Sequence, residues 1–342
     1  MGKRELKAVD NVSFDIYKGE VFGLVGESGC GKTTTGRSII RLYDITGGSV
    51  YYKGERICAG TRSYKDAIKK ARKAYAEGEI SKEELNDIVK TNRAEIKAAM
   101  ADHEKYSRTK GKSQITNEIQ MIFQDPIASL DPRMTVRDII AEGLVIRGVK
   151  DKEFIDQQVY KILETVGLVQ EHASRYPHEF SGGQRQRIGI ARAVIMNPEL
   201  IIADEPISAL DVSIQAQVIN LLHELSEQMG LTIMFIAHDL AVVKYFSDRI
   251  AVMYFGKIVE LGTSDELFAH PFHPYTRSLL SAIPLPDPIT EKNRKRVVYN
   301  PVLDHNYSEE APTMQEVYPG HFVLCNTEEF EKYCKEYEES KI

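Results

Sequence analysis

Short apolar runs separated by helix-length segments dominate the hydrophobic pattern of this chain. Residues 20–25 form a mainly apolar run that leads into Gly26, and residues 12–16 before it alternate apolar and polar side chains. Alternation is typical of a half-buried strand, whereas a short continuous run is typical of a strand buried on both faces. Two more runs, residues 200–203 and 231–236, flank a predicted helix at residues 213–229. The pattern predicts an α/β fold with a mainly parallel sheet.

Four more strands and a long helical stretch complete the pattern. The additional strands are predicted at residues 49–52, 118–123, 250–253 and 257–260. Lys53 and Gly54 supply a turn after the first of these, and the last two form a hairpin pair. Residues 125–195 have a mostly helical pattern and are predicted to form a helical subdomain.

Residues 61–112 differ in texture from the rest of the chain. They are dense in Lys, Arg, Glu and Ala and contain no Pro. Gly78 ends a first helix, and Ser81 with Glu84 forms a capping-box sequence that begins a second one. A thin apolar stripe follows, formed by Leu85, Ile88, Val89, Ile96 and Met100. We predict an inserted, largely solvated helical hairpin, and two roles stay open for it: a tolerated surface excursion and a partner-binding element.

The composition of the chain changes near its C-terminus. Pro284, Pro286 and Pro288 mark a linker, and the tail that follows is acidic and contains tyrosines. We therefore predict one domain over residues 1–283 and a C-terminal extension over residues 284–342.

Overall composition narrows the class of protein. The 342 residues are 42% hydrophobic and 27% charged, which is typical of a soluble globular chain. The net charge of −6 supplies no global basic field for nucleic acid or anionic lipid. The four cysteines form no CxxC pair, so we expect free thiols in a reducing compartment. The N-terminus is polar and no apolar run reaches the length of a membrane span, so we expect a cytoplasmic chain that meets a membrane only by docking.

A phosphate-binding loop follows the first apolar run. Residues 26–33 fit G-x-x-x-x-G-K-[ST], in which glycines let backbone N–H groups converge on phosphates and the next helix presents its positive end. Lys32 is expected to reach the β- and γ-phosphates, and the Thr33 hydroxyl to bind Mg²⁺. The predicted nucleotide-binding residues here are Gly26, Glu27, Ser28, Gly29, Cys30, Gly31, Lys32, Thr33 and Thr34.

Two carboxylates end the apolar run at residues 200–203. Asp204 is suited to bind Mg²⁺, and Glu205 is placed to polarise a water molecule for attack on a γ-phosphate. An isolated Asp-Glu pair would more simply cap the next helix. In a chain that also carries a phosphate loop, we interpret the pair as catalytic.

A second anion-binding helix start lies between these two motifs. Ser181, Gly182, Gly183 and Gln184 open a helix with small residues, although one nucleotide needs only one phosphate loop. We infer that this stretch serves a nucleotide held by another subunit. It resembles the signature motif of ABC ATPases, and the chain resembles an ABC ATPase throughout.

Three more residues match motifs of that family in the expected order. Gln124 resembles the Q-loop glutamine, which senses Mg²⁺ and water; Asp211 lies in a stretch that resembles the D-loop, which crosses the dimer; His238 resembles the switch histidine, which contacts the γ-phosphate. The resemblance implies that Lys32, Gln124, Glu205 and His238 are catalytic and that Thr33, Gln124 and Asp204 hold Mg²⁺.

The resemblance also implies an architecture and a set of partners. The fold would be a P-loop NTPase core with an antiparallel β subdomain and a helical signature subdomain. Two ATPase subunits, identical or related, would close head to tail around ATP and Mg²⁺. They would drive transmembrane permease subunits and, indirectly, an extracellular or periplasmic peptide-binding protein. No nucleic acid is expected, and the chain would lie peripherally on the cytoplasmic face of the membrane.

A closer resemblance concerns the importers of oligopeptides, dipeptides and nickel. It rests on residues 8–16, 123–136, 212–217 and 273–288, and the chain is most similar to the second ATPase of an oligopeptide importer. Dipeptides, nickel or another cargo stay open, because an ATPase never touches the cargo. Two other classes are a non-transport ABC ATPase and an inert binding module. The single phosphate loop disfavours the first, and Glu205 with His238 disfavours the second.

Three features depart from the family pattern. No residue matches the aromatic side chain that stacks on adenine, since Tyr17 lies after residues 12–16. The insertion at residues 61–112 is long for the group and precedes the Q-loop strand, so we expect it beside the coupling surface. Some relatives hold an iron–sulfur cluster on C-terminal cysteines, and Cys325 with Cys334 cannot supply four ligands.

Overall fold

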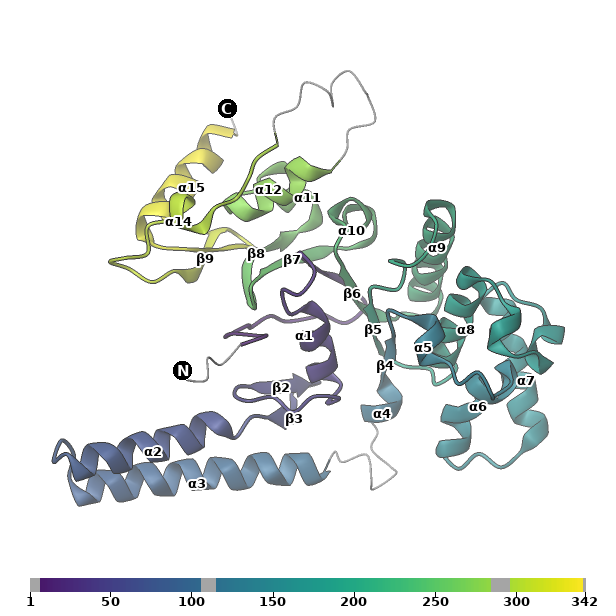
Figure 1. Ribbon diagram of the computed structural model, residues 1–342, viewed down its shortest axis with the longest axis horizontal. Helices are drawn as coiled ribbons and strands as arrows, with labels where there is room; N and C mark the ends of the chain where they lie inside the picture. Colours follow the sequence, from purple (N-terminus) through teal and green to yellow (C-terminus); the bar gives the residue numbers. More distant parts are fainter. Residues whose placement is uncertain (1–6, 106–114, 284–295, 341–342) are drawn as a thin grey trace.

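The computed structural model describes residues 7–105, 115–283 and 296–340. An eight-stranded sheet in the order β4-β5-β6-β1-β7-β8-β10-β9 crosses the molecule (Figure 1). Its strands are β1 Val21–Val25, β4 Ile119–Ile122, β5 Leu200–Asp204, β6 Thr232–Ala237, β7 Arg249–Tyr254, β8 Lys257–Thr263, β9 Thr313–Tyr318 and β10 His321–Cys325.

The first five strands of that order run parallel, whereas β8, β10 and β9 add antiparallel pairs. Every residue of β1, β5 and β6 is buried, as the continuous apolar runs predicted. In β1, Val21 and Val25 join one core cluster, while Phe22 and Leu24 join the other. Successive side chains of a strand point to opposite faces, so both faces of the sheet are covered.

Different helices cover the two faces. The face on which Val21 lies packs against α8 Gly182–Val194, α9 Val212–Met229 and α10 Leu240–Phe246. The opposite face packs against α1 Lys32–Ile39 and strand β3. The remaining short helices are α4 Ile115–Glu118, α11 Ser264–Ala269, α12 Pro274–Ala282 and α14 Pro301–Asp304. This layering brings the start of α1 to the carboxyl ends of the parallel strands, where ligands bind in open α/β sheets.

A small antiparallel sheet forms the predicted β subdomain. It pairs β2 Ser49–Tyr52 with β3 Glu55–Ala59, and Lys53 and Gly54 both have positive φ, 51° and 79°, as a tight hairpin turn requires. The strand predicted at residues 12–16 is wrong, because this segment has no ladder. Its alternation is nevertheless used: apolar side chains pack on the core, and Phe14 stacks on Phe22 at 5.0 Å. The alternating pattern therefore predicted which side chains are buried, but it did not predict whether the backbone pairs with a neighbouring strand.

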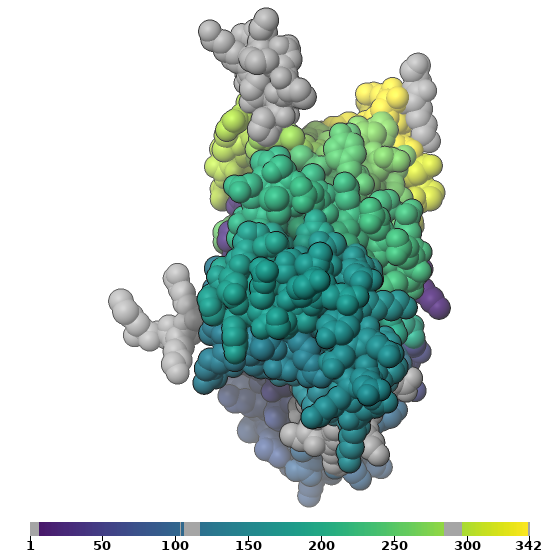
Figure 2. Space-filling model, turned by 90° about the vertical axis from the view of Figure 1, so that its right-hand side faces the viewer, coloured from purple at the N-terminus to yellow at the C-terminus, as the bar shows by residue number. Residues whose placement is uncertain are grey.

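The helical stretch predicted at residues 125–195 is confirmed. It contains α5 Pro126–Ser129, α6 Val136–Ile146, α7 Lys152–Thr165, the short 3₁₀ helices Gln170–Ser174 and Pro177–Glu179, and α8. These elements lie together at one end of the molecule (Figure 1) and form the teal middle and lower part of the face shown in Figure 2.

The predicted insertion folds as two helices, α2 Arg62–Ala76 and α3 Lys82–Lys105. Ser81 and Glu84 form the expected capping box, with the Ser81 amide 2.7 Å from the Glu84 carboxylate and the Glu84 amide 3.1 Å from the Ser81 hydroxyl. Within the predicted thin apolar stripe, Met100 is 64% exposed, whereas its neighbour Ala99, outside the stripe, is buried. The hairpin extends away from the body of the molecule (Figure 1).

The C-terminal residues join the main sheet. Strand β10 pairs with β8, and α15 Thr327–Ser340 packs beside them. The predicted proline linker, Pro284 to Pro288, lies outside the described residues, and the division of the chain at residue 284 stays a prediction.

All four cysteines are free. Across the parts of the chain that the structure describes, no helix combines the length and apolar character needed to cross a membrane.

Candidate active site

The phosphate loop connects β1 to α1. Gly26 and Gly31 have φ of 151° and 112°, and a Cβ atom at these positions would lie 2.1 Å from the Met253 carbonyl oxygen and 2.2 Å from the Ala8 carbonyl oxygen. No side chain fits there, so the two glycines are required by close backbone approach as well as by conformation. Ser28 and Gly29 form the exposed tip of the loop, and Thr34 lies inside the first turn of α1.

Lys32 is folded into the concave side of this loop. Its side chain is 3% exposed, and Nζ donates hydrogen bonds to the carbonyl oxygens of Gly26 at 2.7 Å and Glu27 at 2.9 Å. The same Nζ lies 3.9 Å from Oε1 of Glu205. A cation is thus held between the phosphate loop and the acidic end of β5.

Asp204 ends β5 directly beside the start of α1. The Thr33 hydroxyl donates to its Oδ1 at 2.8 Å, and Arg37 Nη2 lies 3.8 Å from its Oδ2. The carboxylate is fully buried, and this burial raises the pKa of Asp204, although the bond from Thr33 and the charge of Arg37 oppose the shift.

Oδ2 of Asp204 is buried and has no hydrogen-bond partner among the described residues. A buried carboxylate oxygen that accepts no hydrogen bond is costly unless it binds a cation, and Arg37 at 3.8 Å supplies only a long ion pair. With the Thr33 hydroxyl beside it, the pair offers the oxygen donors that Mg²⁺ prefers. The residues present therefore fit a magnesium ion.

Glu205 is the point at which the other predicted catalytic residues meet. Its side chain is 12% exposed; Gln124 Nε2 donates to its Oε2 at 3.0 Å, and His238 Nδ1 lies 3.4 Å from the same oxygen. Gln124 follows β4, Glu205 follows β5 and His238 follows β6, so three adjacent parallel strands deliver them to one edge.

The backbone of Glu205 is unusual. Its φ is 44°, in the left-handed region that non-glycine residues rarely adopt, and its N–H donates to the Ile236 carbonyl oxygen at 3.0 Å. Such conformations cost free energy and persist where the surrounding structure enforces them. Here the strain turns the carboxylate toward Gln124 and His238.

The signature residues do not join this cluster. Ser181 caps α8, accepting from the Gln184 amide at 3.4 Å, while the Ser181 amide donates to the Gln184 side chain at 3.0 Å. A Cβ atom on Gly183 would lie 2.6 Å from the Ile214 side chain, so only a glycine allows α8 to approach α9 this closely. Gly182 lies exposed beside them, and Asp211 is exposed at the start of α9 without a side-chain cap bond.

One contact to the loop was missed by the sequence analysis. The amide of Glu27 donates to the hydroxyl oxygen of Tyr275 at 3.1 Å, and Tyr275 is buried in α12 against the ring of Tyr254, 4.4 Å away. Burial raises the pKa of Tyr275, so the hydroxyl stays protonated. Tyr275 lies in the C-terminal stretch that resembled peptide importers, but no local pattern indicates that it reaches a loop so distant in sequence.

Comparison with known proteins agrees with this geometry. The family described as "ABC transporter" matches residues 9–82 and 80–208, which is more than half of the chain. The chain belongs to the ABC transporter family. A second family, described as "Oligopeptide/dipeptide transporter, C-terminal region", matches residues 259–305. The predicted membership and enzyme class are therefore confirmed: the chain is an ABC ATPase.

Similar curated proteins cover nearly the whole of this ABC ATPase. The "Oligopeptide transport ATP-binding protein OppF" of Bacillus subtilis (strain 168) is 55% identical over 96% of this chain and 93% of its own length. The "Dipeptide transport ATP-binding protein DppF" of Lactococcus lactis subsp. cremoris (strain MG1363) is 48% identical over 96% of this chain and 91% of its own length.

Solved structures agree on the fold. "Dimeric structure of a post-hydrolysis state of the ATP-binding cassette MJ0796 bound to ADP and Pi" matches with a TM-score of 0.55 at 26% identity, over 77% of this chain and 94% of that chain. The predicted ABC ATPase fold class is confirmed. The individual roles of the site residues stay predictions.

Proposed function

We propose that this ABC ATPase hydrolyses ATP at composite sites between two ATPase subunits and thereby powers import of oligopeptides through a membrane permease. The observation that carries the hydrolytic part is the convergence of Lys32, Gln124 and His238 on Glu205. The cargo is supported by the relative named for oligopeptide transport, which is 55% identical.

Each residue of the cluster has a task in phosphoryl transfer. Glu205 accepts a proton from the attacking water and orients it toward the γ-phosphate. Gln124 and His238, both within 3.4 Å of the Glu205 carboxylate, orient it and contact the water and γ-phosphate. Lys32 binds the phosphate oxygens when they replace the Gly26 and Glu27 carbonyl oxygens as its partners.

Magnesium is the cofactor that the donor set fits. Thr33 and Asp204 would hold it, with Gln124 as a third ligand. When bound, Mg²⁺ neutralises charge that develops on the β- and γ-phosphates. The residues of this chain orient the nucleotide and the attacking water.

The second half of each composite site is assigned to a neighbouring ATPase subunit. In the described part of the chain, no hydrogen bond or ion pair links Ser181–Gln184 or Asp211 to the phosphate loop. The signature helix nevertheless begins with small residues, and Ser181 and Gly182 are exposed at its positive end. Its position supports a nucleotide that belongs to the partner, which is identical or related to this chain.

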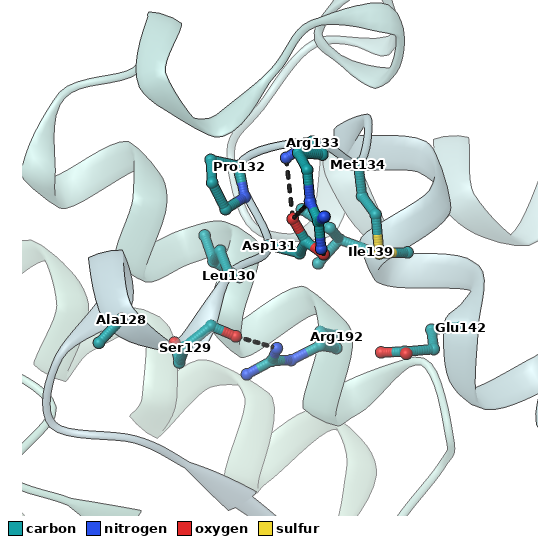
Figure 3. Close-up of a pocket in the computed structure, with 10 residues that line it drawn as sticks. All are labelled: Ala128, Ser129, Leu130, Asp131, Pro132, Arg133, Met134, Ile139, Glu142 and Arg192. Atoms are coloured by element: carbon teal, nitrogen blue, oxygen red, sulfur yellow. Dashed lines mark hydrogen bonds and ion pairs between the residues drawn. The ribbon is translucent and has the colours of Figure 1, made fainter.

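A cavity next to the Q-loop supports the permease partner. It has a volume of about 640 Å³ and lies between the segment after Gln124 and helices α6 and α8 (Figure 3). Arg192 extends toward Ser129 and donates to its carbonyl oxygen at 2.6 Å, and the Glu142 carboxylate points toward Arg192 from the other side (Figure 3). On the neighbouring helix α6, Ile146 is 71% exposed. A cytoplasmic loop of the permease would seat here, and its movement would be coupled to Gln124 through a few residues.

The proposed contact with the permease supports a peripheral position of the ATPase on the cytoplasmic face of the membrane. Cargo selection lies with the permease and its peptide-binding protein. Dipeptide import is the second candidate, because the relative named for dipeptide transport is 48% identical over nearly the same range.

The test is uptake of a labelled pentapeptide by the source cells that carry either the native chain or Glu205→Gln. Loss of uptake in the mutant, with the protein still present, supports oligopeptide import driven by this site. Unchanged pentapeptide uptake contradicts the proposed cargo, and a parallel assay with a labelled dipeptide then tests the second candidate. Glu224→Gln, an exposed carboxylate on α9, is the matched control and should leave uptake unchanged.

A further inference from the structure

Helix α2 of the inserted hairpin has a strongly basic composition. In its 15 residues it carries a single acidic side chain, Asp66, in a chain whose net charge is −6. Its basic residues, all exposed, are Arg62, Lys65, Lys69, Lys70, Arg72 and Lys73. Helix α3, by contrast, mixes both signs along its length.

The basic side chains share one side of α2. At 3.6 residues per turn, positions 65, 69 and 72 lie within about 60° of one another, and position 70 lies about 100° further round from position 69, at the other flank of the same exposed half of the helix. Helix α2 contacts α3, and the residues of α2 that are buried or half-buried share one side at the spacing of an amphipathic helix; these are Tyr64, Ala67, Ile68, Ala71 and Ala74. The basic side therefore points away from α3 and from the body of the protein.

Most of these charges have no counter-charge. Arg62 lies 3.8 Å from Asp66, and Lys73 lies 3.5 Å from Glu77. For the other four, no carboxylate of residues 7–105, 115–283 or 296–340 lies within ion-pair distance. We define Lys65, Lys69, Lys70 and Arg72 as the basic face of α2.

The hairpin lies at the permease side of the sheet. Along the chain the hairpin comes before α4 and β4, and the segment that lines the cavity assigned to the permease comes after β4. Strand β4 is one edge of the sheet, and β9 of the C-terminal region is the opposite edge. Both views agree, since the hairpin and the C-terminal elements lie at opposite ends of the vertical axis (Figures 1 and 2).

We propose that the basic face of α2 binds the anionic phospholipid headgroups of the membrane that holds the permease. The inference rests on the proposed function, which brings this edge of the ATPase to that membrane. Anionic headgroups attract juxtamembrane Lys and Arg, and each such residue strengthens binding about fivefold. The basic face contains no apolar side chain, so α2 lies on the headgroups without inserting.

The acidic net charge of the chain does not oppose this contact. Charges separated by more than about 8 Å are screened at physiological ionic strength, and the hairpin extends away from the body. The charge of the basic face therefore acts locally. The hairpin would hold the ATPase against the bilayer while the permease loop occupies the cavity.

The experiment is flotation of the purified full chain with phosphatidylcholine vesicles, with and without phosphatidylglycerol. We expect binding only when phosphatidylglycerol is present, and a steep loss of binding as salt rises. Replacing the four residues of the basic face by Gln should weaken binding by on the order of a hundredfold or more. A matched control, Lys82, Lys90, Arg93 and Lys97 of α3 changed to Gln, removes equal charge and should bind as the native chain does.

Both variants should hydrolyse ATP at the native rate, which shows that they are folded. Equal binding to both kinds of vesicle, or native binding by the basic-face variant, would overturn the proposal. Binding that requires permease in the vesicles would also overturn it, because the partner would then be protein. Vesicle binding does not depend on the cargo. A failed pentapeptide assay would therefore contradict the proposed function without contradicting the proposed lipid binding.

Discussion

The hydroxyl oxygen of Tyr275 lies 3.1 Å from the backbone nitrogen of Glu27 and accepts its hydrogen. Glu27 is the second residue of the phosphate loop, and its carbonyl oxygen in turn accepts from Lys32 at 2.9 Å. One loop residue is therefore held on both sides, by Lys32 and by a tyrosine from the C-terminal region. Tyr275 itself is fixed by the rings of Tyr254 and Tyr299.

Tyr275→Phe should weaken ATP binding while leaving the fold intact. The change removes one hydrogen bond to a partly buried amide, a loss of about 0.5–1.5 kcal/mol, which corresponds to roughly a two- to tenfold rise in KM for ATP. Steady-state ATPase kinetics measure it. Tyr254→Phe is the control, because it keeps the ring packing and removes no hydrogen bond to the loop. An unchanged KM in Tyr275→Phe would show that the loop does not depend on this contact.

Glu205→Gln should abolish turnover and retain ATP. Glutamine keeps the size of the side chain and cannot accept the proton of water, and a general base contributes on the order of 10²–10⁴-fold to the rate. Phosphate release and nucleotide retained after desalting are the measurements. Hydrolysis at the native rate would contradict the role assigned to Glu205.

Asp204→Asn should separate stability from activity. Burial raises the pKa of Asp204. For an acid whose pKa is higher in the folded state, stability falls as pH rises through that range, so the ionised carboxylate destabilises the fold at pH 7. Asparagine removes that charge, and the Tm should rise. Mg²⁺-dependent hydrolysis should nevertheless fall by on the order of a hundredfold, because a charged ligand is lost.

Thermal unfolding and a magnesium titration of ATPase activity test the two halves of this prediction. Acidification gives an independent check, since protonation of Asp204 in the native chain should weaken Mg²⁺ activation as pH falls. A variant with a lower Tm and native magnesium dependence would contradict both halves.

The parts of the site that the sequence predicts are those with local chemistry. The spacing of the glycines in residues 26–33 predicts a phosphate-binding loop. The position of Asp204 and Glu205 at the end of a buried apolar run predicts their place at the edge of the sheet. The roles expected of Gln124 and His238 came from family resemblance alone. Their meeting at Glu205 was not predicted, because three separate strands deliver these side chains.

Non-local pairing is what the sequence could not supply. Strand β10 joins β8, whose residues lie about 60 positions earlier, and neither segment encodes its partner. Tyr275 contacts Glu27 from 248 positions away. Residues 12–16 are a second example in which the sequence did not reveal strand pairing. The burial pattern predicted for this segment was correct, but its predicted strand was not.

The attachment of the C-terminal region depends on a buried contact between Glu260 and His321. Both side chains are at most 1% exposed, and His321 Nε2 lies 2.8 Å from Oε1 of Glu260. The amides of Phe272 and His273 donate to the same carboxylate at 2.9 and 3.1 Å. Glu260 therefore joins β8, β10 and the segment before α12 in one network.

His321→Ala should destabilise the protein by about 3–5 kcal/mol, because it leaves a buried carboxylate without one of its three donors. Urea denaturation measures the loss, and limited proteolysis should show early cleavage within the C-terminal region. His223→Ala, an exposed histidine on α9, should change stability by less than about 0.5 kcal/mol. Equal stability of the two variants would mean that β10 is held to the sheet by its backbone ladder and apolar packing, with the Glu260 network contributing little.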